Sequence, residues 1–298
     1  VAGGTYVYVE RSLGPWMGTI AGLGTWFSLS AKTAFALVGL GGYLVLFTTA
    51  NPQTIALGIL GCMVVLNLLG ASKASLLQSI IVFTCLVVLV GFFVIGGINV
   101  DPKLQDPAFP EGVWGIIGAA GFVFVSYAGV TKICSVAEEV KNPSRNIPLA
   151  MLLAQGSVMV LYTAISWVIT GNVYYDKLAE DLAPMATVAR AFGGEWGQSI
   201  IAIIAIAGLA SMCNAGVMAT ARFPFAMSRD DLLPKFLQNI NHKFGTPVPA
   251  ILITGLFLLV LVTFFPVVKL AKLASGFKIF VFCMVNLTVI ILRETAPR

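Results

Sequence analysis

Residues 121–143, which read GFVFVSYAGVTKICSVAEEVKNP, decide the fold class of this chain. The stretch begins as an apolar run typical of a membrane-spanning helix. It then places Ser126, Gly129, Thr131 and Lys132 where the middle of the span would be. Lipid offers no hydrogen bonds, so a helix that is weakened at that depth is tolerated only around a cavity or an ion path. We therefore expect a carrier rather than a passive anchor.

The whole chain is too apolar to form a soluble globular domain. Of its 298 residues, 58% are hydrophobic and only 10% are charged, whereas a soluble domain averages about 25% charged residues. Apolar runs of about 20 residues fit helices that cross a hydrocarbon core of about 30 Å, and the alternation expected of β-barrel strands does not persist. We predict an all-α polytopic membrane protein, with residues 1–298 as a single transmembrane domain.

The hydropathy pattern predicts eight spans. They are expected at about residues 15–47, 52–70, 75–98, 113–137, 147–171, 195–221, 248–266 and 273–292. Pairs such as Asn51-Pro52 and Asn142-Pro143 mark connections, because the residue before proline resists the helical conformation. We also expect a short surface helix from about Leu178 to Phe192.

The basic residues favour one orientation. If the N-terminal end is cytoplasmic, ten Lys and Arg residues lie in cytoplasmic segments, five lie in the opposite loops, and three lie within spans. The positive-inside rule favours this arrangement, which places residues 138–146 and 222–247 in the cytoplasm. Because the net charge of +5 comes mostly from short loops, it does not indicate a nucleic-acid ligand.

Neither a metal site nor an enzyme active site is indicated. The five cysteines all lie in apolar spans without metal-ligand spacing, and buried cysteine usually behaves as a small apolar residue. Glu138 and Glu139 are close to Lys141 and Arg145, which favours salt bridges or a conformational latch over paired catalytic carboxylates. We expect no cofactor and no enzymatic activity.

Three blocks of sequence resemble the amino-acid permeases of the amino acid–polyamine–organocation superfamily. They are Gly3-Gly4-Thr5-Tyr6-Val7-Tyr8 with Gly14-Pro15, the run 138–148, and the run 227–234 followed by 245–250. The blocks come in family order at family spacing. On this register the eight spans are family helices three to ten. We therefore expect a fragment in which the first two family helices are missing.

The resemblance implies a fold and a function. The fold is two inverted five-helix repeats with substrate at the membrane midplane, of which residues 1–98 would be the remainder of the first and residues 113–292 the second. The function is secondary active transport of amino acids across the plasma membrane by alternating access, as an antiporter or a symporter. The alternatives are a channel subunit, a non-transporting scaffold and, less in keeping with the residues, a membrane-embedded enzyme.

The broken helix near residues 125–131 is the first candidate for the substrate site. Carbonyls of an unwound segment can face the cavity, and the half-helix that follows offers free N–H groups. By resemblance, two carbonyls would hold the substrate ammonium, and the alternative is that Gly129 only permits close helix packing. The candidate residues are Val125 and Ala128 for these carbonyls, with Ser126, Gly129, Val130 and Thr131 beside them.

Four further polar residues lie within the predicted spans. Lys132, just past the break, would cost about 2.5–3.5 kcal/mol at mid-membrane on insertion scales. It could attract a carboxylate, replace a coupling ion or switch a proton, and the alternatives are pairing with Glu138 or Glu139 and snorkelling. Lys32, Thr33 and Asn214 either face the cavity or form polar seams between helices.

The charged residues within the predicted spans bear on the substrate and on the coupling ion. Embedded lysines facing the cavity would repel a cationic side chain, so neutral or acidic amino acids are predicted. Some bacterial relatives carry a lysine on the fifth family helix in place of sodium, but the matching run 81–85 has none. Proton coupling, sodium coupling and exchange all stay open. The lipid bilayer is the expected partner, and a homodimer is compatible with the sequence.

Overall fold

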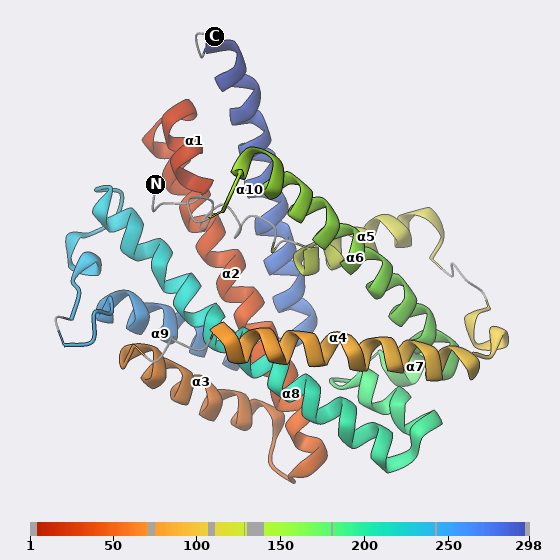
Figure 1. Ribbon diagram of the computed structural model, residues 1–298. Coiled ribbons are helices and arrows are strands. Elements are labelled where there is room, and N and C mark those ends of the chain that lie inside the picture. The colour runs from red at the N-terminus through yellow and green to blue at the C-terminus, as the bar shows by residue number, and fades with distance from the viewer. Residues whose placement is uncertain are drawn as a thin grey trace.

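The computed structural model describes residues 5–70, 75–106, 111–127, 129, 140–179, 181–241 and 243–295. In these ranges the chain is a bundle of helices (Figure 1). The apolar helices are α2 (Pro15–Leu44), α3 (Pro52–Leu68), α4 (Ser75–Ile98), α5 (Gly112–Tyr127), α6 (Pro143–Asn172), α8 (Pro184–Arg229), α9 (Val248–Phe264) and α10 (Val267–Thr295). Shorter helices are α1 (Thr5–Leu13) and α7 (Tyr175–Leu178), and 3-10 turns cover Val45–Phe47, Pro102–Gln105 and Lys235–Gln238.

The helices are long and apolar enough for a membrane protein. Five of those described could cross a bilayer by length and composition, and α3, α5 and α9 are apolar helices of 10–17 residues. The all-α polytopic membrane architecture predicted from composition is confirmed. The outer faces of α4 and α6 expose large apolar side chains, including Phe83, Leu152 and Trp167, as expected of surfaces that meet lipid.

Proline begins several of these helices. Pro15, Pro52, Pro143 and Pro184 occupy the first helical turn, where the missing N–H costs nothing because it would have no intrahelical partner. At α3 the side chain of Asn51 also accepts a hydrogen bond of 2.9 Å from the Gln53 N–H, which caps the helix. The predicted connections therefore coincide with real helix starts.

The region around α7 and α8 differs from the sequence prediction. The short surface helix expected from about Leu178 to Phe192 begins later than predicted, because α7 ends at Leu178 and the next helix begins at Pro184. Asp181 accounts for the new start, since its carboxylate accepts hydrogen bonds from the Ala183 N–H (2.7 Å) and the Thr187 hydroxyl (2.5 Å). Gly194, with φ of 61°, then interrupts the helix, a conformation that favours glycine.

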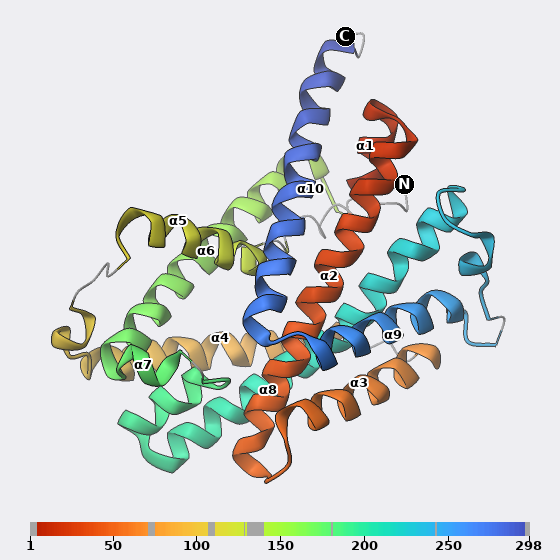
Figure 2. The same ribbon diagram turned by 180° about the vertical axis from the view of Figure 1, so that it is seen from behind.

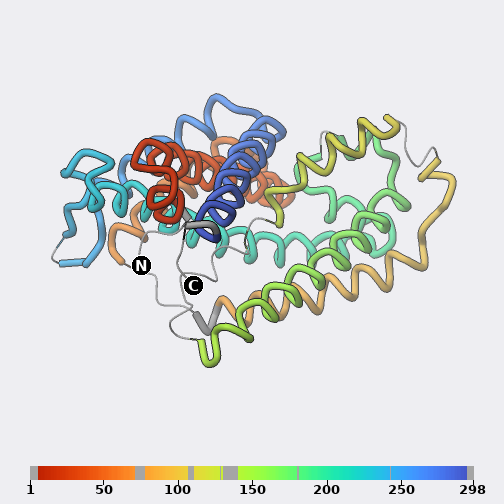
Figure 3. Tube along the Cα trace, turned by 90° about the horizontal axis from the view of Figure 1, so that it is seen from above, coloured from red at the N-terminus to blue at the C-terminus, as the bar shows by residue number. Residues whose placement is uncertain are grey.

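Helix α2 lies at the centre of the bundle. It packs against α1, α3, α8, α9 and α10, and the two opposite views show it running steeply between α8 and α10 (Figures 1 and 2). Seen from above, α4, α5 and α6 lie to one side and α3, α9 and α10 to the other, with α8 extending across both (Figure 3). A polar residue on α2 can therefore reach several other helices.

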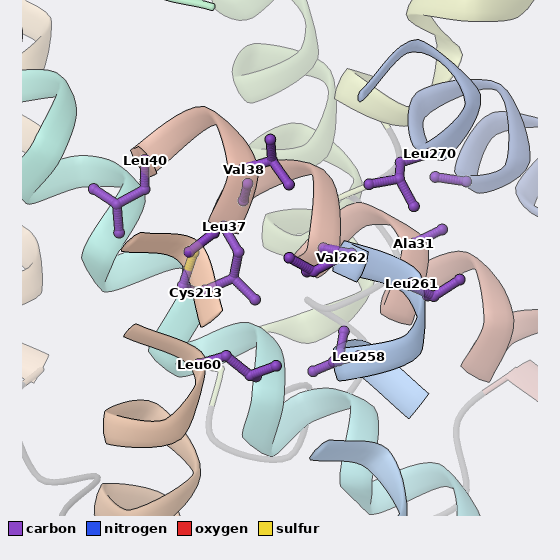
Figure 4. Close-up of a cluster of buried hydrophobic side chains, with 14 of the residues drawn as sticks. Ala31, Leu37, Val38, Leu40, Leu60, Cys213, Leu258, Leu261, Val262 and Leu270 are labelled. Atoms are coloured by element: carbon purple, nitrogen blue, oxygen red, sulfur yellow. The ribbon is translucent and has the colours of Figure 1, made fainter. Parts of the chain in front are cut away.

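The main core is built around the middle of α2. Leu37 packs with Leu60 of α3, Cys213 of α8 and Leu258 of α9 (Figure 4). Most of the buried positions on the same stretch of α2 are small, such as Ala31, Ala34 and Ala36. Lipid tails are as apolar as these side chains, so membrane helices associate through close packing that small residues permit, rather than through the hydrophobic effect.

Helix α1 is tied to the end of α8. Tyr6 is fully buried against Met227 and Phe223, and its hydroxyl donates a hydrogen bond of 2.6 Å to Oδ2 of Asp230. Burial, and then the hydrogen bond to Asp230, raise the pKa of Tyr6 well above its usual range. Two sequence blocks separated by more than 200 residues thus meet on one side of the bundle.

We expect Tyr6→Phe to lower the free energy of unfolding by about 1 kcal/mol, because one hydrogen bond to a charged group is lost while the exposed Asp230 regains water. Thermal unfolding of the full-length protein in detergent measures this. Because the pKa of folded Tyr6 lies above its ordinary value of 10.0, the contribution of Tyr6 is complete below pH 10 and falls as the pH rises further.

Tyr8→Phe is the matched control, because Tyr8 is 54% exposed and its replacement should leave stability nearly unchanged. Equal stability of the Tyr6→Phe variant and the wild type would contradict the proposed role of the Tyr6–Asp230 bond.

Candidate functional site

The end of α5 lies beside the middle of α2. Lys32 is near the centre of the 30-residue helix α2, and its Nζ donates a hydrogen bond of 3.3 Å to the carbonyl oxygen of Val125. Val125 is two residues from the end of α5. The 16 residues of α5 rise only about 24 Å, less than the hydrocarbon core of about 30 Å. These relations put the last described turn of α5 beside the middle of α2.

Helix α10 holds the same turn from another side. The Ser275 hydroxyl accepts a hydrogen bond of 3.1 Å from the Val125 N–H and donates one of 2.8 Å to the Phe122 carbonyl. The Phe124 ring meets the Phe282 ring edge-on at 5.6 Å between centroids. Ser275 therefore bonds to backbone rather than to a side chain, which fixes the height and rotation of the last turn of α5.

A second lysine, Lys278, is buried on α10. Lys278 is 3% exposed, and its Nζ lies 4.9 Å from the centroid of the Phe282 ring. An ammonium over an aromatic face is stabilised by the ring quadrupole, more so when the pair is desolvated. Lys32 thus bonds directly to the last described turn of α5, and Lys278 is linked to that turn through the Phe282 ring, which meets Phe124.

The predicted break can be placed only in part. The end of α5 at Tyr127 falls within the expected segment 125–131, and Gly129 lies in an exposed turn. Val125 is buried, while the Ser126 side chain is exposed. Ala128, Val130, Thr131 and Lys132 lie outside the described residues.

Thr33 packs at the crossing of α2 and α8. Its hydroxyl donates a hydrogen bond of 2.8 Å to the Leu29 carbonyl of its own helix. A Cβ added to Gly216 of α8 would lie 2.6 Å from the Thr33 Oγ1, so the crossing requires glycine there. In this structure Thr33 is buried and engaged in helix packing.

Asn214 takes part in a hydrogen bond between α3 and α8. The Nδ2 of Asn67 donates to the Asn214 Oδ1 at 2.9 Å and to the Met63 carbonyl at 2.8 Å. This geometry is that of the polar seam considered as the alternative for Asn214. Lys32 is the predicted residue that the structure joins to Val125.

Sequence reasoning assigned no role to Ser275 or Lys278. Lys278 carried a usable signal, because a charge within a predicted span usually has a functional or pairing reason. Ser275 carried little, since a hydroxyl beside Ala274 and Gly276 also suits ordinary helix packing. Its partners on α5 are 150 residues away in sequence.

Two hollows lie elsewhere on the described surface. One of about 300 Å³ between α4 and α8 includes Gln78, Cys85 and Ser211 in its lining, and it borders the run 81–85 in which no lysine is found. The other, of about 640 Å³, follows α10 past Lys269, Lys272 and Phe277. Neither is lined by the last turn of α5.

Comparison with known proteins agrees with this architecture. The family model described as amino acid permease matches residues 1–298. The chain belongs to the amino acid permease family. The resemblance found in the three sequence blocks is thereby confirmed, and the eight apolar helices are those of an integral membrane permease.

Three relatives of this chain are transporters or permeases, and the names of two of them give a class of amino acid. An uncharacterized transporter of Mycobacterium tuberculosis is 32% identical over 85% of the chain and 58% of its own length. A branched-chain amino acid permease of Bacillus subtilis is 28% identical over 100% of the chain and 68% of its own length. A vacuolar cationic amino acid transporter of Arabidopsis thaliana is 32% identical over 76% of the chain and 39% of its own length.

We predict that Asn67 and Asn214 act as a structural pair. Asn67→Ala and Asn214→Ala should each lower stability, and the double variant should fall short of their sum by about 0.6 kcal/mol, the usual strength of a hydrogen bond between membrane helices. Chemical unfolding of the full-length permease in detergent measures the free energies of unfolding of the wild type and the three variants, which together form a double-mutant cycle. A strictly additive double variant, together with a loss of substrate affinity confined to Asn214→Ala, would assign Asn214 to the substrate site instead.

Proposed function

We propose that this permease is the central part of a secondary active transporter that moves amino acids across the plasma membrane by alternating access. The observation that carries the proposal is the contact of α2 with the last described turn of α5, where the Val125 carbonyl already holds an ammonium group, that of Lys32. A carbonyl that attracts one ammonium can attract the ammonium of an amino acid. Family membership supports transport as the general activity.

The proposed site uses the two ends of a broken helix. The substrate ammonium would bind the carbonyls of Val125 and Ala128, while its carboxylate would meet N–H groups of the segment that follows. Ser126 and Gly129 are exposed at this point, which leaves the backbone accessible. Ser275 would act as a positioning residue, because it holds the Val125 N–H and the Phe122 carbonyl without facing the substrate itself.

Neutral or acidic amino acids are the proposed substrates. Lys32 bonds to the last described turn of α5, and the buried Lys278 lies over the Phe282 ring that meets Phe124 of α5, so cationic side chains would be repelled at low dielectric. The branched-chain name of the Bacillus relative fits this proposal, and the cationic name of the Arabidopsis relative does not. The charge on this chain's own helices therefore carries the proposal on substrate class.

The proposed movement separates two groups of helices. In the two-repeat arrangement, α2, α3 and α4 belong to the first repeat and α5 to α10 to the second, so the Lys32–Val125 bond joins the repeats. The Tyr6–Asp230 bond joins them again on the side that the positive-inside rule assigns to the cytoplasm. Alternating access would open and close contacts of this kind. Protons, sodium or a counter-substrate could drive it.

The test is uptake by the purified full-length permease in liposomes. Labelled L-leucine should enter saturably, and neutral or acidic amino acids should compete for uptake far better than arginine or lysine. Imposed sodium and pH gradients, applied separately, identify the driving ion.

Saturation separates a carrier from a channel, whose flux would rise linearly with concentration over the same range. Absence of uptake for all twenty amino acids under every gradient would contradict the proposal and favour a different small solute or a scaffold. Efficient arginine uptake would contradict only the proposed substrate class.

A further inference from the structure

Lys32 occupies the place that the substrate ammonium needs. Its Nζ lies 3.3 Å from the Val125 carbonyl oxygen, and Lys32 itself is only half-buried within the bundle. The Val125 carbonyl belongs to the last described turn of α5. An ammonium is well suited to this point, because the C-terminal end of a helix carries a partial negative charge.

Two ammonium groups cannot share this carbonyl comfortably. Each would have to approach the oxygen to about 3 Å, which leaves the two charges only a few ångströms apart. Their repulsion is strong in a medium of low dielectric constant, where water does not screen it. Binding of an amino acid through the Val125 carbonyl therefore requires that the Lys32 ammonium leave.

We propose that Lys32 is an internal cation that occupies the Val125 carbonyl in the absence of substrate and is displaced when an amino acid binds. This inference rests on the proposed function, and it adds a linkage to it. Displacement breaks the bond between α2 and α5, so binding would free the two helices to move relative to each other. The ammonium of the substrate would thus be the group that unlocks this contact.

Two other roles for Lys32 make different predictions. If Lys32 is only a cross-link between helices, its replacement alters stability without regard to ligand charge. If it attracts the substrate carboxylate, its replacement weakens every ligand that has a carboxylate. An internal competitor has the opposite effect on one chemical group alone, because its removal favours ligands that carry an ammonium.

The experiment uses three ligands that separate the ammonium of an amino acid from its carboxylate. L-leucine carries both groups, isoamylamine carries only the ammonium, and 4-methylpentanoate carries only the carboxylate. Their affinities for the purified full-length permease would be measured by binding competition, in the wild type and in Lys32→Gln. The amide of glutamine keeps a donor near the Val125 carbonyl but removes the charge, which protects the fold.

Lys32→Gln should bind leucine and isoamylamine about fivefold more tightly, the effect of removing a competing charge at a helix end, and should bind 4-methylpentanoate unchanged. Lys32→Met should give the same pattern and Lys32→Arg should not. Lys269→Met is the matched control, because it removes an exposed α10 cation that lines a hollow away from the last turn of α5, and it should not produce the selective gain.

Unchanged affinity for all three ligands, or weaker binding of leucine and 4-methylpentanoate, would overturn the inference while leaving the proposed function in place. If leucine is not bound, L-alanine and L-glutamate with their matching amines and acids replace it. If the wild type and the variants bind none of the twenty amino acids, the proposed function itself fails and this inference fails with it.

Discussion

A helix that ends inside a membrane leaves carbonyl oxygens that lipid cannot satisfy. Leaving such a group unpaired costs several kcal/mol, whereas a hydrogen bond between membrane helices contributes only about 0.6 kcal/mol on average. At the last described turn of α5, Lys32 of α2 donates to the Val125 carbonyl, which is one of the last four of the described helix. Ser275 of α10 adds a second contact through the Phe122 carbonyl and the Val125 N–H.

The central position of α2 makes this arrangement possible. Small residues on α2, and Gly216 on α8 where Thr33 packs, allow the helices to approach closely. Polar side chains along α2 then reach backbone or side-chain partners on other helices. The Ser28 hydroxyl donates to the Ala274 carbonyl at 2.7 Å, and the Trp26 indole donates to the Thr254 hydroxyl at 3.2 Å. Packing and hydrogen bonding on α2 thus position the parts of the candidate site together.

Much of the fold could be predicted because hydrophobic length and proline placement are local signals. The break expected near residues 125–131 stays a prediction, because most of the residues after Tyr127 lie outside the described ranges. The hydrogen-bond partners on different helices could not be predicted from the sequence. Lys32 and Val125 are 93 residues apart, and Asn67 and Asn214 are 147 apart, so only the packing of whole helices decides that Lys32 meets the site while Asn214 meets Asn67. The start of α8 is also held by the hydrogen bonds that Asp181 accepts from Ala183 and Thr187, which a hydropathy pattern does not register.

We propose that the Val125 carbonyl binds the Lys32 ammonium in the absence of substrate and the substrate ammonium when an amino acid is bound. The most direct measurement is a structure of the full-length permease in lipid nanodiscs with L-leucine bound, compared with the substrate-free form. We expect the leucine ammonium to lie within hydrogen-bonding distance of the Val125 carbonyl and the Lys32 Nζ to have moved away. Leucine bound elsewhere, with Lys32 still on Val125, would contradict it.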